Sequence, residues 1–220
     1  MTHEIKNHWL VHEPMTDRPI SLRALKPRGS KLPLFPQNLT FRTSDFSSPE
    51  ALKQAFEDDA LSLNGAGYNV YTVMNPIRRD FQGNLAVKDA DITDITTILI
   101  DIDRNGDTSQ PATDMEIDAA FKLANEVEAY LRLKGFPNPF WVHSGNGYHL
   151  YYRINPTPKT EVTTQTVERL LAGLAIRFSN SVVGVDASVY NPSRITKVIG
   201  TIARKGVESE GRPYRMAKLV

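Results

Sequence analysis

The chain has 220 residues, a hydrophobic fraction of 40% and a formal net charge of +1, values typical of an ordinary globular protein with one large domain or two small ones. It contains no cysteine, which excludes disulfide bonds and thiolate metal sites. No apolar run approaches the roughly 20 residues of a membrane span, and the N-terminus lacks the apolar core of a signal peptide. We therefore expect a cytoplasmic protein without a membrane partner.

Charge is distributed unevenly along the chain. Residues 18–44 hold six Lys and Arg and no acid, residues 45–118 hold fifteen Asp and Glu against five Lys and Arg, and residues 194–220 hold seven Lys and Arg against two Glu. An acidic middle between basic ends would bring metal ligands next to a phosphate-binding surface. Solvated faces without function explain the same pattern, and charge distribution alone favours that simpler interpretation.

The first half of the chain predicts an α/β unit. Its expected elements are a strand at 19–25, a loop at 26–38, a helix from about 47 that ends at 64–67, and a strand at 68–76. The helix start is marked by Ser48 as N-cap and Pro49 at the first helical position.

The second half alternates strands and helices. The expected elements are strands at 96–103, 139–145, 148–154, 182–188 and 196–203, and helices at 113–135 and 159–178. Thr113 and Glu116 form a possible capping box for the first of these helices, and Gly135 ends it. The order predicts an α/β or α+β fold with a mixed sheet.

The strand TTILIDID, residues 96–103, ends in two aspartates. Asp101 and Asp103 share one face because strand side chains alternate. Two carboxylates so close repel each other unless a cation lies between them, and hard divalent cations prefer such oxygen ligands. A calcium loop of the EF-hand type fails, because its twelfth position falls on Ala112 instead of a glutamate. Exposed acids at a strand end are at least as common an explanation for this pattern alone.

A second motif, SGNGYH, lies between two apolar strands. Glycines let backbone N–H groups approach a ligand, and a run of such groups with a serine hydroxyl can bind an anion. The imidazole two residues after the turn could contact a phosphate oxygen. The candidate residues are Ser144, Gly145, Asn146, Gly147 and His149. A β-hairpin with a packed histidine is the simpler interpretation of this motif by itself.

A third motif is Asp186 at the end of the strand VVGVD, followed by basic residues. Arg194, Lys197 and Lys205 come next, with Gly200-Thr201 between the lysines. Asp186 is a candidate third carboxylate for the same metal site. A guanidinium fork suits phosphate oxygens, and a lysine supplies a point charge.

Together these motifs resemble the archaeo-eukaryotic primase superfamily, and more narrowly the primase-polymerase domains of phage and plasmid replication proteins. That family carries hhhDhD, then S-G-x-G-x-H, then hhD, in this order. The matching segments are ILIDID at 98–103, SGNGYH at 144–149 and VGVD at 183–186. The resemblance spans roughly residues 18–215.

The resemblance implies an RRM-like mixed sheet that carries the acidic site and packs against an N-terminal α/β unit. We expect one catalytic domain over residues 1–220, with the N-terminal unit at about 15–90 and the RRM-like catalytic unit at about 91–220. Family members often continue into a helical module and a helicase domain. A fragment of a longer primase-helicase and a stand-alone core both stay open.

The resemblance also implies the chemistry. Two divalent ions, Mg²⁺ or Mn²⁺, are held by Asp101, Asp103 and Asp186 during template-directed nucleotidyl transfer on DNA with dNTPs or NTPs. The implied triphosphate ligands are Ser144, Gly145, Asn146, Gly147, His149, Arg194 and Lys205. A helicase domain or protein is a further expected partner.

Two other classes of function are weighed against this one. A replication-initiator nuclease needs paired histidines as metal ligands, but His143 and His149 do not form an HxH pair. A catalytically silent nucleotide- or nucleic-acid-binding initiator module stays open as the main alternative, although it has no need of three carboxylates beside phosphates. Arg78 and Arg79 are further candidate contacts to template or nucleotide.

Overall fold

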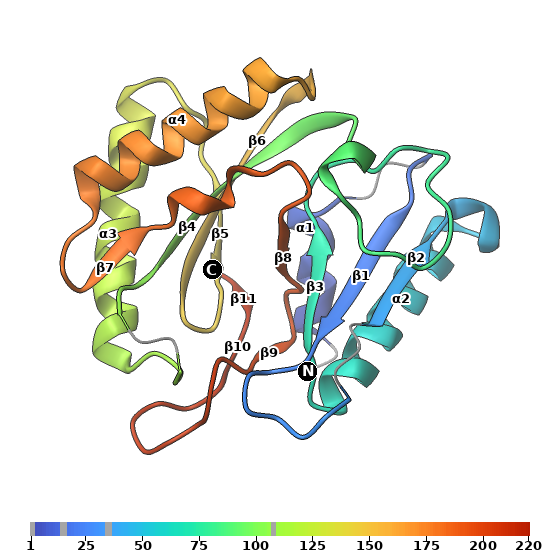
Figure 1. The fold of residues 1–220 in the computed structure, drawn as a ribbon, viewed down its shortest axis with the longest axis horizontal. Helices are drawn as coiled ribbons and strands as arrows, with labels where there is room; N and C mark the ends of the chain where they lie inside the picture. Colours follow the sequence, from blue (N-terminus) through green and yellow to red (C-terminus); the bar gives the residue numbers. More distant parts are fainter. Residues whose placement is uncertain (1–2, 14–16, 34–36, 107–108) are drawn as a thin grey trace.

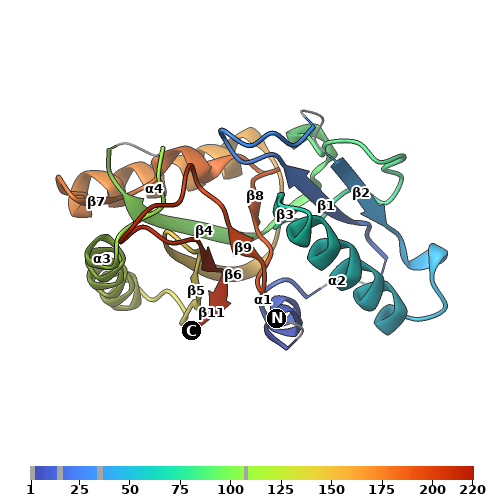
Figure 2. The ribbon, with the colours of Figure 1, turned by 90° about the horizontal axis from the view of Figure 1, so that it is seen from below.

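The structure is a computed structural model that describes residues 3–13, 17–33, 37–106 and 109–220. Two β-sheets lie side by side, each covered by helices on one face (Figure 1 and Figure 2). None of the helices in these ranges has the length and apolar character needed to cross a membrane.

The first sheet has the strand order β2-β1-β3-β8. Its strands are β2 (Gln37–Phe41), β1 (Ile20–Leu25), β3 (Asn69–Val73) and β8 (Ile195–Lys197). Helix α2 (Pro49–Gly65) covers one face through a core that includes the fully buried Leu22, Phe56 and Val70. Among the described residues, no α-helix covers the other face (Figure 1).

The second sheet has the order β11-β5-β6-β4-β7 and carries the larger core. Its strands are β11 (Lys218–Leu219), β5 (Phe140–His143), β6 (Gly147–Pro158), β4 (Asp94–Arg104) and β7 (Val183–Val185). Helices α3 (Asp114–Leu133) and α4 (Glu161–Phe178) cover one face (Figure 2). The remaining elements are α1 (His8–Val11), the strand pair β9 (Ile202–Ala203) and β10 (Arg215–Met216), and the 3-10 turns η1 (Glu4–Asn7), η2 (Thr43–Asp45), η3 (Asp89–Asp91) and η4 (Ala187–Tyr190).

The predicted α/β class is confirmed, but within the described ranges every strand pairing is antiparallel, where the sequence predicts a mixed sheet. The reason is the connectivity. The α3 crossover joins β4 to β5, which run in the same direction, but β6 lies between them. The α4 crossover likewise joins β6 to β7 with β4 between them. Each helical crossover therefore links parallel strands that do not touch.

Both predicted helix starts are confirmed. The Ser48 hydroxyl accepts a hydrogen bond from the Ala51 amide at 3.1 Å, as an N-cap does. Thr113 and Glu116 form the reciprocal capping box of α3, with bonds of 2.7 and 3.2 Å. Gly135, with φ of +86°, lies just beyond the end of α3 as expected.

The C-terminal and N-terminal segments differ from the prediction. The single strand expected at 196–203 is divided into β8 and β9, which belong to different sheets. The division falls at Gly200, whose φ is +86° and whose position has no room for a Cβ, because that atom would lie 2.5 Å from the Ile5 amide nitrogen. Ile5 is itself buried, so the N-terminal turn and α1, which the sequence patterns do not indicate, are part of the core.

The loop predicted at 26–38 is shorter than expected, because β2 begins at Gln37; residues 34–36 of that loop lie outside the described residues. Strand β8 returns to the first sheet from beyond residue 90. The predicted boundary near residue 90 therefore separates most of the strands of the two sheets but not all of them, and the division into two units stays a prediction.

Candidate functional site

A cavity of about 420 Å³ lies where the second sheet meets the edge of the first. Eight of the ten predicted site residues line it: Asp101, Asp103, Ser144, Asn146, His149, Asp186, Arg194 and Lys205. These residues come from four separate segments of the chain, so the fold has brought together motifs that are far apart in sequence. Gly145 and Gly147 are not among its lining residues in the described part of the chain.

The ladder between β4 and β6 explains why the acids face this cavity. Asp101 lies opposite His149, and Asp103 lies opposite Gly147, so these residues share one face of the sheet. On the other face, Tyr148 of β6 contacts Phe121 of α3. The helices therefore cover one face of the ladder and leave the acidic face open to the cavity.

The two carboxylates have different surroundings. Asp101 Oδ1 lies 3.5 Å from His149 Nε2, whereas Asp103 Oδ2 contacts the Lys205 ammonium. Burial alone would raise the pKa of the Asp101 carboxyl, but His149, and then Lys205 and Arg194, hold that pKa below its ordinary value. Burial raises the pKa of Asp103, and the Asp101 charge adds to this rise although Lys205 opposes it. The pair therefore needs nearby positive charge to stay ionised.

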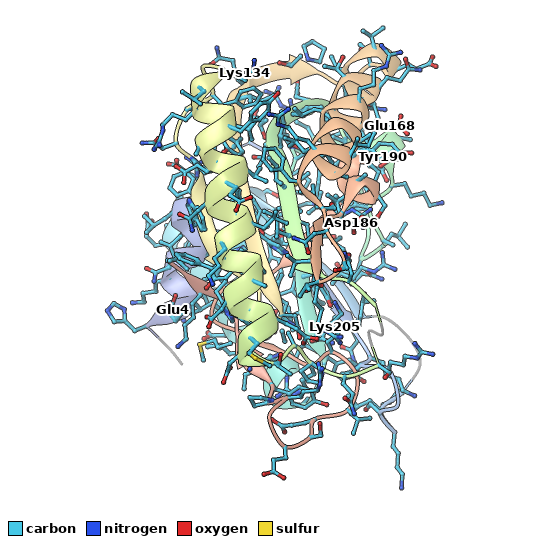
Figure 3. The ribbon with its side chains drawn as sticks, turned by 90° about the vertical axis from the view of Figure 1, so that its left-hand side faces the viewer. Glu4, Lys134, Glu168, Asp186, Tyr190 and Lys205 are labelled. Atoms are coloured by element: carbon cyan, nitrogen blue, oxygen red, sulfur yellow. The ribbon has the colours of Figure 1, made fainter. Side chains whose placement is uncertain are left out.

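Asp186 extends the acidic group from the neighbouring strand. It follows β7, and its amide donates to the Asp101 carbonyl oxygen at 2.9 Å, which fixes its backbone beside the first aspartate. Its Oδ1 accepts a hydrogen bond from the Ser188 amide at 2.8 Å at the start of η4. Figure 3 shows Asp186 beside β4, and it shows Lys205 near the end of that strand.

The donor atoms in this cavity are of the kind that a hard divalent cation prefers. Three carboxylates from adjacent strand ends supply only oxygen ligands, which Mg²⁺ and Mn²⁺ prefer. In the side-chain positions described, no three His, Asp or Glu residues converge closely enough to hold an ion. Lys205 instead neutralises Asp103. An ion at Asp103 would take over the charge that Lys205 now supplies.

The glycines of the SGNG turn have packing roles. A Cβ at Gly147 would lie 2.1 Å from the Ile102 carbonyl oxygen of β4, and Gly145 has φ of +98° with a Cβ position 2.5 Å from the Ala203 side chain. The Ser144 hydroxyl accepts hydrogen bonds from the amides of Asn146 and Gly147 at 3.4 and 3.1 Å. These two amides point at Ser144, so a role in anion binding stays a prediction.

Asn146 and His149 are both buried, but they are held in different ways. Asn146 Oδ1 accepts a hydrogen bond from the Ala112 amide at 3.0 Å, which ties the turn to the segment before α3. His149 Nδ1 lies 2.9 Å from the Tyr151 hydroxyl, and its other nitrogen faces Asp101. The imidazole therefore presents Nε2 to the cavity from a fixed ring.

The cavity also contains basic side chains that the motif analysis did not assign to the site. They are Lys26, Arg28, Lys197 and Arg204. Lys197 is buried, donates to Asn69 Oδ1 at 2.9 Å and lies 5.1 Å from the centre of the Tyr71 ring. Burial and then Arg204 lower the pKa of its ammonium well below the ordinary value. The sequence signal was its spacing, three residues after Arg194, which directly precedes β8.

Comparison with known proteins gives a fold. No family model matches the chain, and no curated protein matches it. Among solved structures, the primase-polymerase AEP domain of cyanophage S-2L is 18% identical, with a TM-score of 0.56 over 100% of this chain and 89% of that one. Primase RepB′ is 11% identical, with a TM-score of 0.53 over 99% of this chain and 55% of that one. The chain has an archaeo-eukaryotic primase-like fold.

The primase-like fold confirms the resemblance found from the three sequence motifs. At this identity the similarity extends to the fold alone, and the assignment of individual residues rests on the cavity. Each motif lies in or directly after a strand of the second sheet, with Asp103 on β4, His149 on β6 and Asp186 after β7.

Proposed function

We propose that the protein is a template-directed nucleotidyltransferase, a DNA primase or primer-extending DNA polymerase that acts in the replication of a mobile element. One observation carries the proposal. In a primase-like fold, three aspartates from two adjacent strand ends and six Lys and Arg side chains line the same cavity. A nucleoside triphosphate with its divalent ions is a ligand that needs both sets of groups.

In this proposal Asp101, Asp103 and Asp186 hold two divalent ions, Mg²⁺ or Mn²⁺. The chemistry such ions supply when bound is activation of a primer 3′-hydroxyl and neutralisation of the triphosphate for in-line displacement. The protein contributes rigid placement. Asp101 and Asp103 sit on a long central strand, and the Asp186 backbone is bonded to Asp101. Positioning and charge neutralisation supply most of the catalysis in such reactions.

The basic side chains around the acids receive the triphosphate. Lys205, which contacts Asp103 in this structure, would be free to bind a phosphate oxygen if an ion neutralised that acid. Arg194, which directly precedes β8, and Lys197 on β8 add charge, and His149 donates Nε2–H from the sheet. Phosphate bound near Lys197 would favour its charged form and so raise the pKa that burial has lowered.

The helix-free face of the first sheet provides a path for the template strand. In register across four strands lie Asn38, Arg23, Tyr71 and Lys197, of which the last two also line the cavity. Asn38 Oδ1 and Arg23 Nε are buried atoms without a hydrogen-bond partner among the described residues. Amide, guanidinium and aromatic groups are those that contact single-stranded nucleic acid.

This row replaces Arg78 and Arg79 as the main candidate contacts to the template. Arg78 is paired with Asp80 and Asp91, and Arg79 is paired with Asp17. Their charges are already neutralised within the protein, whereas the guanidinium of Arg23 is in no ion pair within the described ranges.

One observation favours a second candidate, a catalytically silent nucleotide- or nucleic-acid-binding module. Lys205 forms an ion pair with Asp103, the internal charge compensation that a binding protein with no metal requirement would use. Such a module would still bind nucleotide and DNA, but it would not form a phosphodiester bond.

Primer extension separates the two. A labelled primer on a DNA template is incubated with dNTPs or NTPs, each with Mg²⁺ or Mn²⁺. We expect extension by the wild type and none by Asp101→Ala/Asp103→Ala. The matched control Asp58→Ala/Asp59→Ala, which removes two exposed acids from α2, should extend normally. Circular dichroism checks that both variants fold. Full activity of the first double variant would disprove the assignment of the site, and no extension by folded wild type would favour the silent module.

A further inference from the structure

A buried polar chain leads from the cavity to the N-terminal segment. It starts at His149, whose Nδ1 lies 2.9 Å from the hydroxyl of the fully buried Tyr151. The Thr196 side chain of β8 lies close enough to the Tyr151 hydroxyl to oppose the rise in its pKa that burial causes. Thr196 Oγ1 in turn lies 3.5 Å from His12 Nε2, and the His12 ring packs edge-on against Tyr151 at 5.2 Å. Four polar groups from three parts of the chain thus follow one another behind the proposed phosphate-binding histidine.

The neighbouring carboxylate determines which groups donate and which accept hydrogen bonds along this row of polar side chains. A neutral imidazole carries one N–H, and Asp101 Oδ1 at 3.5 Å from Nε2 favours the hydrogen on that nitrogen. Nδ1 is then the acceptor, so the Tyr151 hydroxyl donates to it. Burial raises the pKa of Tyr151, which keeps this donor protonated. Burial first, and then Arg153 and His149, lower the pKa of His12 to about 3, so the far end of this polar chain is neutral.

We propose that Tyr151 is a positioning residue whose hydroxyl holds His149 in the tautomer and ring orientation that present Nε2–H to the cavity. Thr196 and His12 hold that hydroxyl in turn. The inference rests on the proposed function, because a phosphate oxygen of the nucleotide is the group that Nε2–H would meet. It assigns a role at the site to the N-terminal segment, which contributes no residue to the lining of the cavity in the described part of the chain.

The chain supplies a matched control in the next residue. Tyr152 is also 0% exposed, but it lies on the opposite face of β6, where its ring packs edge-on against Phe136. Its hydroxyl has no hydrogen-bond partner among the described residues. Tyr151→Phe and Tyr152→Phe therefore make the same chemical change in the same strand, and only the first removes a bond to His149.

Nitrogen NMR of the metal-free, nucleotide-free protein tests the inference without any catalysis. Histidine is labelled with ¹⁵N, the pH is held well above the ordinary histidine pKa of about 6.5, and His149 is assigned by the loss of its signals in His149→Gln. We expect the Nε2–H tautomer in the wild type and in Tyr152→Phe. In Tyr151→Phe the signals should shift toward a mixture of tautomers, and Thr196→Val should give a smaller shift in the same direction. An Nδ1–H tautomer in the wild type, or identical spectra for both phenylalanine variants, would overturn the proposal.

Steady-state kinetics then connect the tautomer to the substrate. Tyr151→Phe should raise KM for the nucleotide about tenfold, at the lower end of what loss of such an outer partner costs at metal-bound histidines. Its kcat should change less than its KM, and Tyr152→Phe should match the wild type. Equal KM values for the two variants would overturn the positioning role. A wild type without polymerase activity would contradict the proposed function, while the NMR result would still decide the role of Tyr151.

Discussion

The two faces of the ladder between β4 and β6 contrast sharply in what they carry. On one face Ile100 and Ile102 of β4 are fully buried against the helices. On the other, Asp101 and Asp103 are partly exposed and line the cavity. Side chains one residue apart therefore belong either to the core or to the candidate site. One face supplies the stability that allows the other to hold like charges together.

The largest expected effects come from changing one residue on each face. Ile100→Ala should lower the free energy of unfolding by about 2–5 kcal/mol, because it opens a cavity in a close-packed core. Asp101→Asn should abolish nucleotide incorporation and change the unfolding free energy far less. Urea denaturation and primer extension on both variants measure this. An Asp101→Asn protein that is as unstable as Ile100→Ala would show that the acidic face also holds the fold together.

The turn that precedes β6 lies between the two faces, and substitution of its glycines tests whether they are needed for packing or for the candidate site. Gly147→Ala should cost about 3 kcal/mol, because its Cβ would collide with the Ile102 carbonyl oxygen of β4. Gly173→Ala in α4 meets nothing within 4 Å and should stabilise the helix by about 0.5–1 kcal/mol. Thermal unfolding of both variants provides the comparison. A stable Gly147→Ala protein with weak nucleotide binding would return this glycine to a phosphate-binding role.

The contrast between the faces was predictable from the sequence where the signals are local. Alternation in the strand that ends at Asp103 places both acids on one face, and the Ser48 and Thr113 caps mark two helices. The meeting of the three motifs was not derivable from any one of them. It followed only from their order, which resembles a known family.

Other features depend on contacts that a local pattern does not encode. The two-residue strands β9, β10 and β11 exist only because distant segments lie beside them. The sequence marks Lys197 only as a strand residue, and its burial beside Asn69 and Tyr71 is visible only in the structure. The sequence motif predicts that the turn glycines bind phosphate. In the structure, their close neighbours on β4 and β9 leave no room for a Cβ atom, which is a steric reason for glycine at both positions.

Lys197 provides a pH-dependent test of how the cavity stores charge. Its pKa is lowered in the folded state, so the unfolded chain binds more protons between that lowered value and the ordinary 10.5. The free energy of unfolding should therefore rise with pH across this window, by at most about 1.4 kcal/mol per pH unit. Lys197→Met should remove this slope and raise stability at neutral pH. Urea denaturation across the window measures it, with the exposed Lys122→Met as control. Equal slopes in wild type and Lys197→Met would show that the ammonium stays hydrated.

The smallest expected effect extends the comparison to the first sheet, where α2 covers one face and the Asn38–Arg23–Tyr71–Lys197 row lies on the other. Arg23→Met should weaken binding of a single-stranded oligonucleotide about threefold to tenfold, and it should reduce the dependence of log K on log salt by about 0.7, as expected for one phosphate contact. Lys53→Met removes one charge from α2 and should change neither. Fluorescence anisotropy in chelator, at several salt concentrations, measures binding without catalysis. The net charge changes equally in both variants. Equal losses of affinity would therefore indicate a general electrostatic effect, and they would contradict a template path along this row.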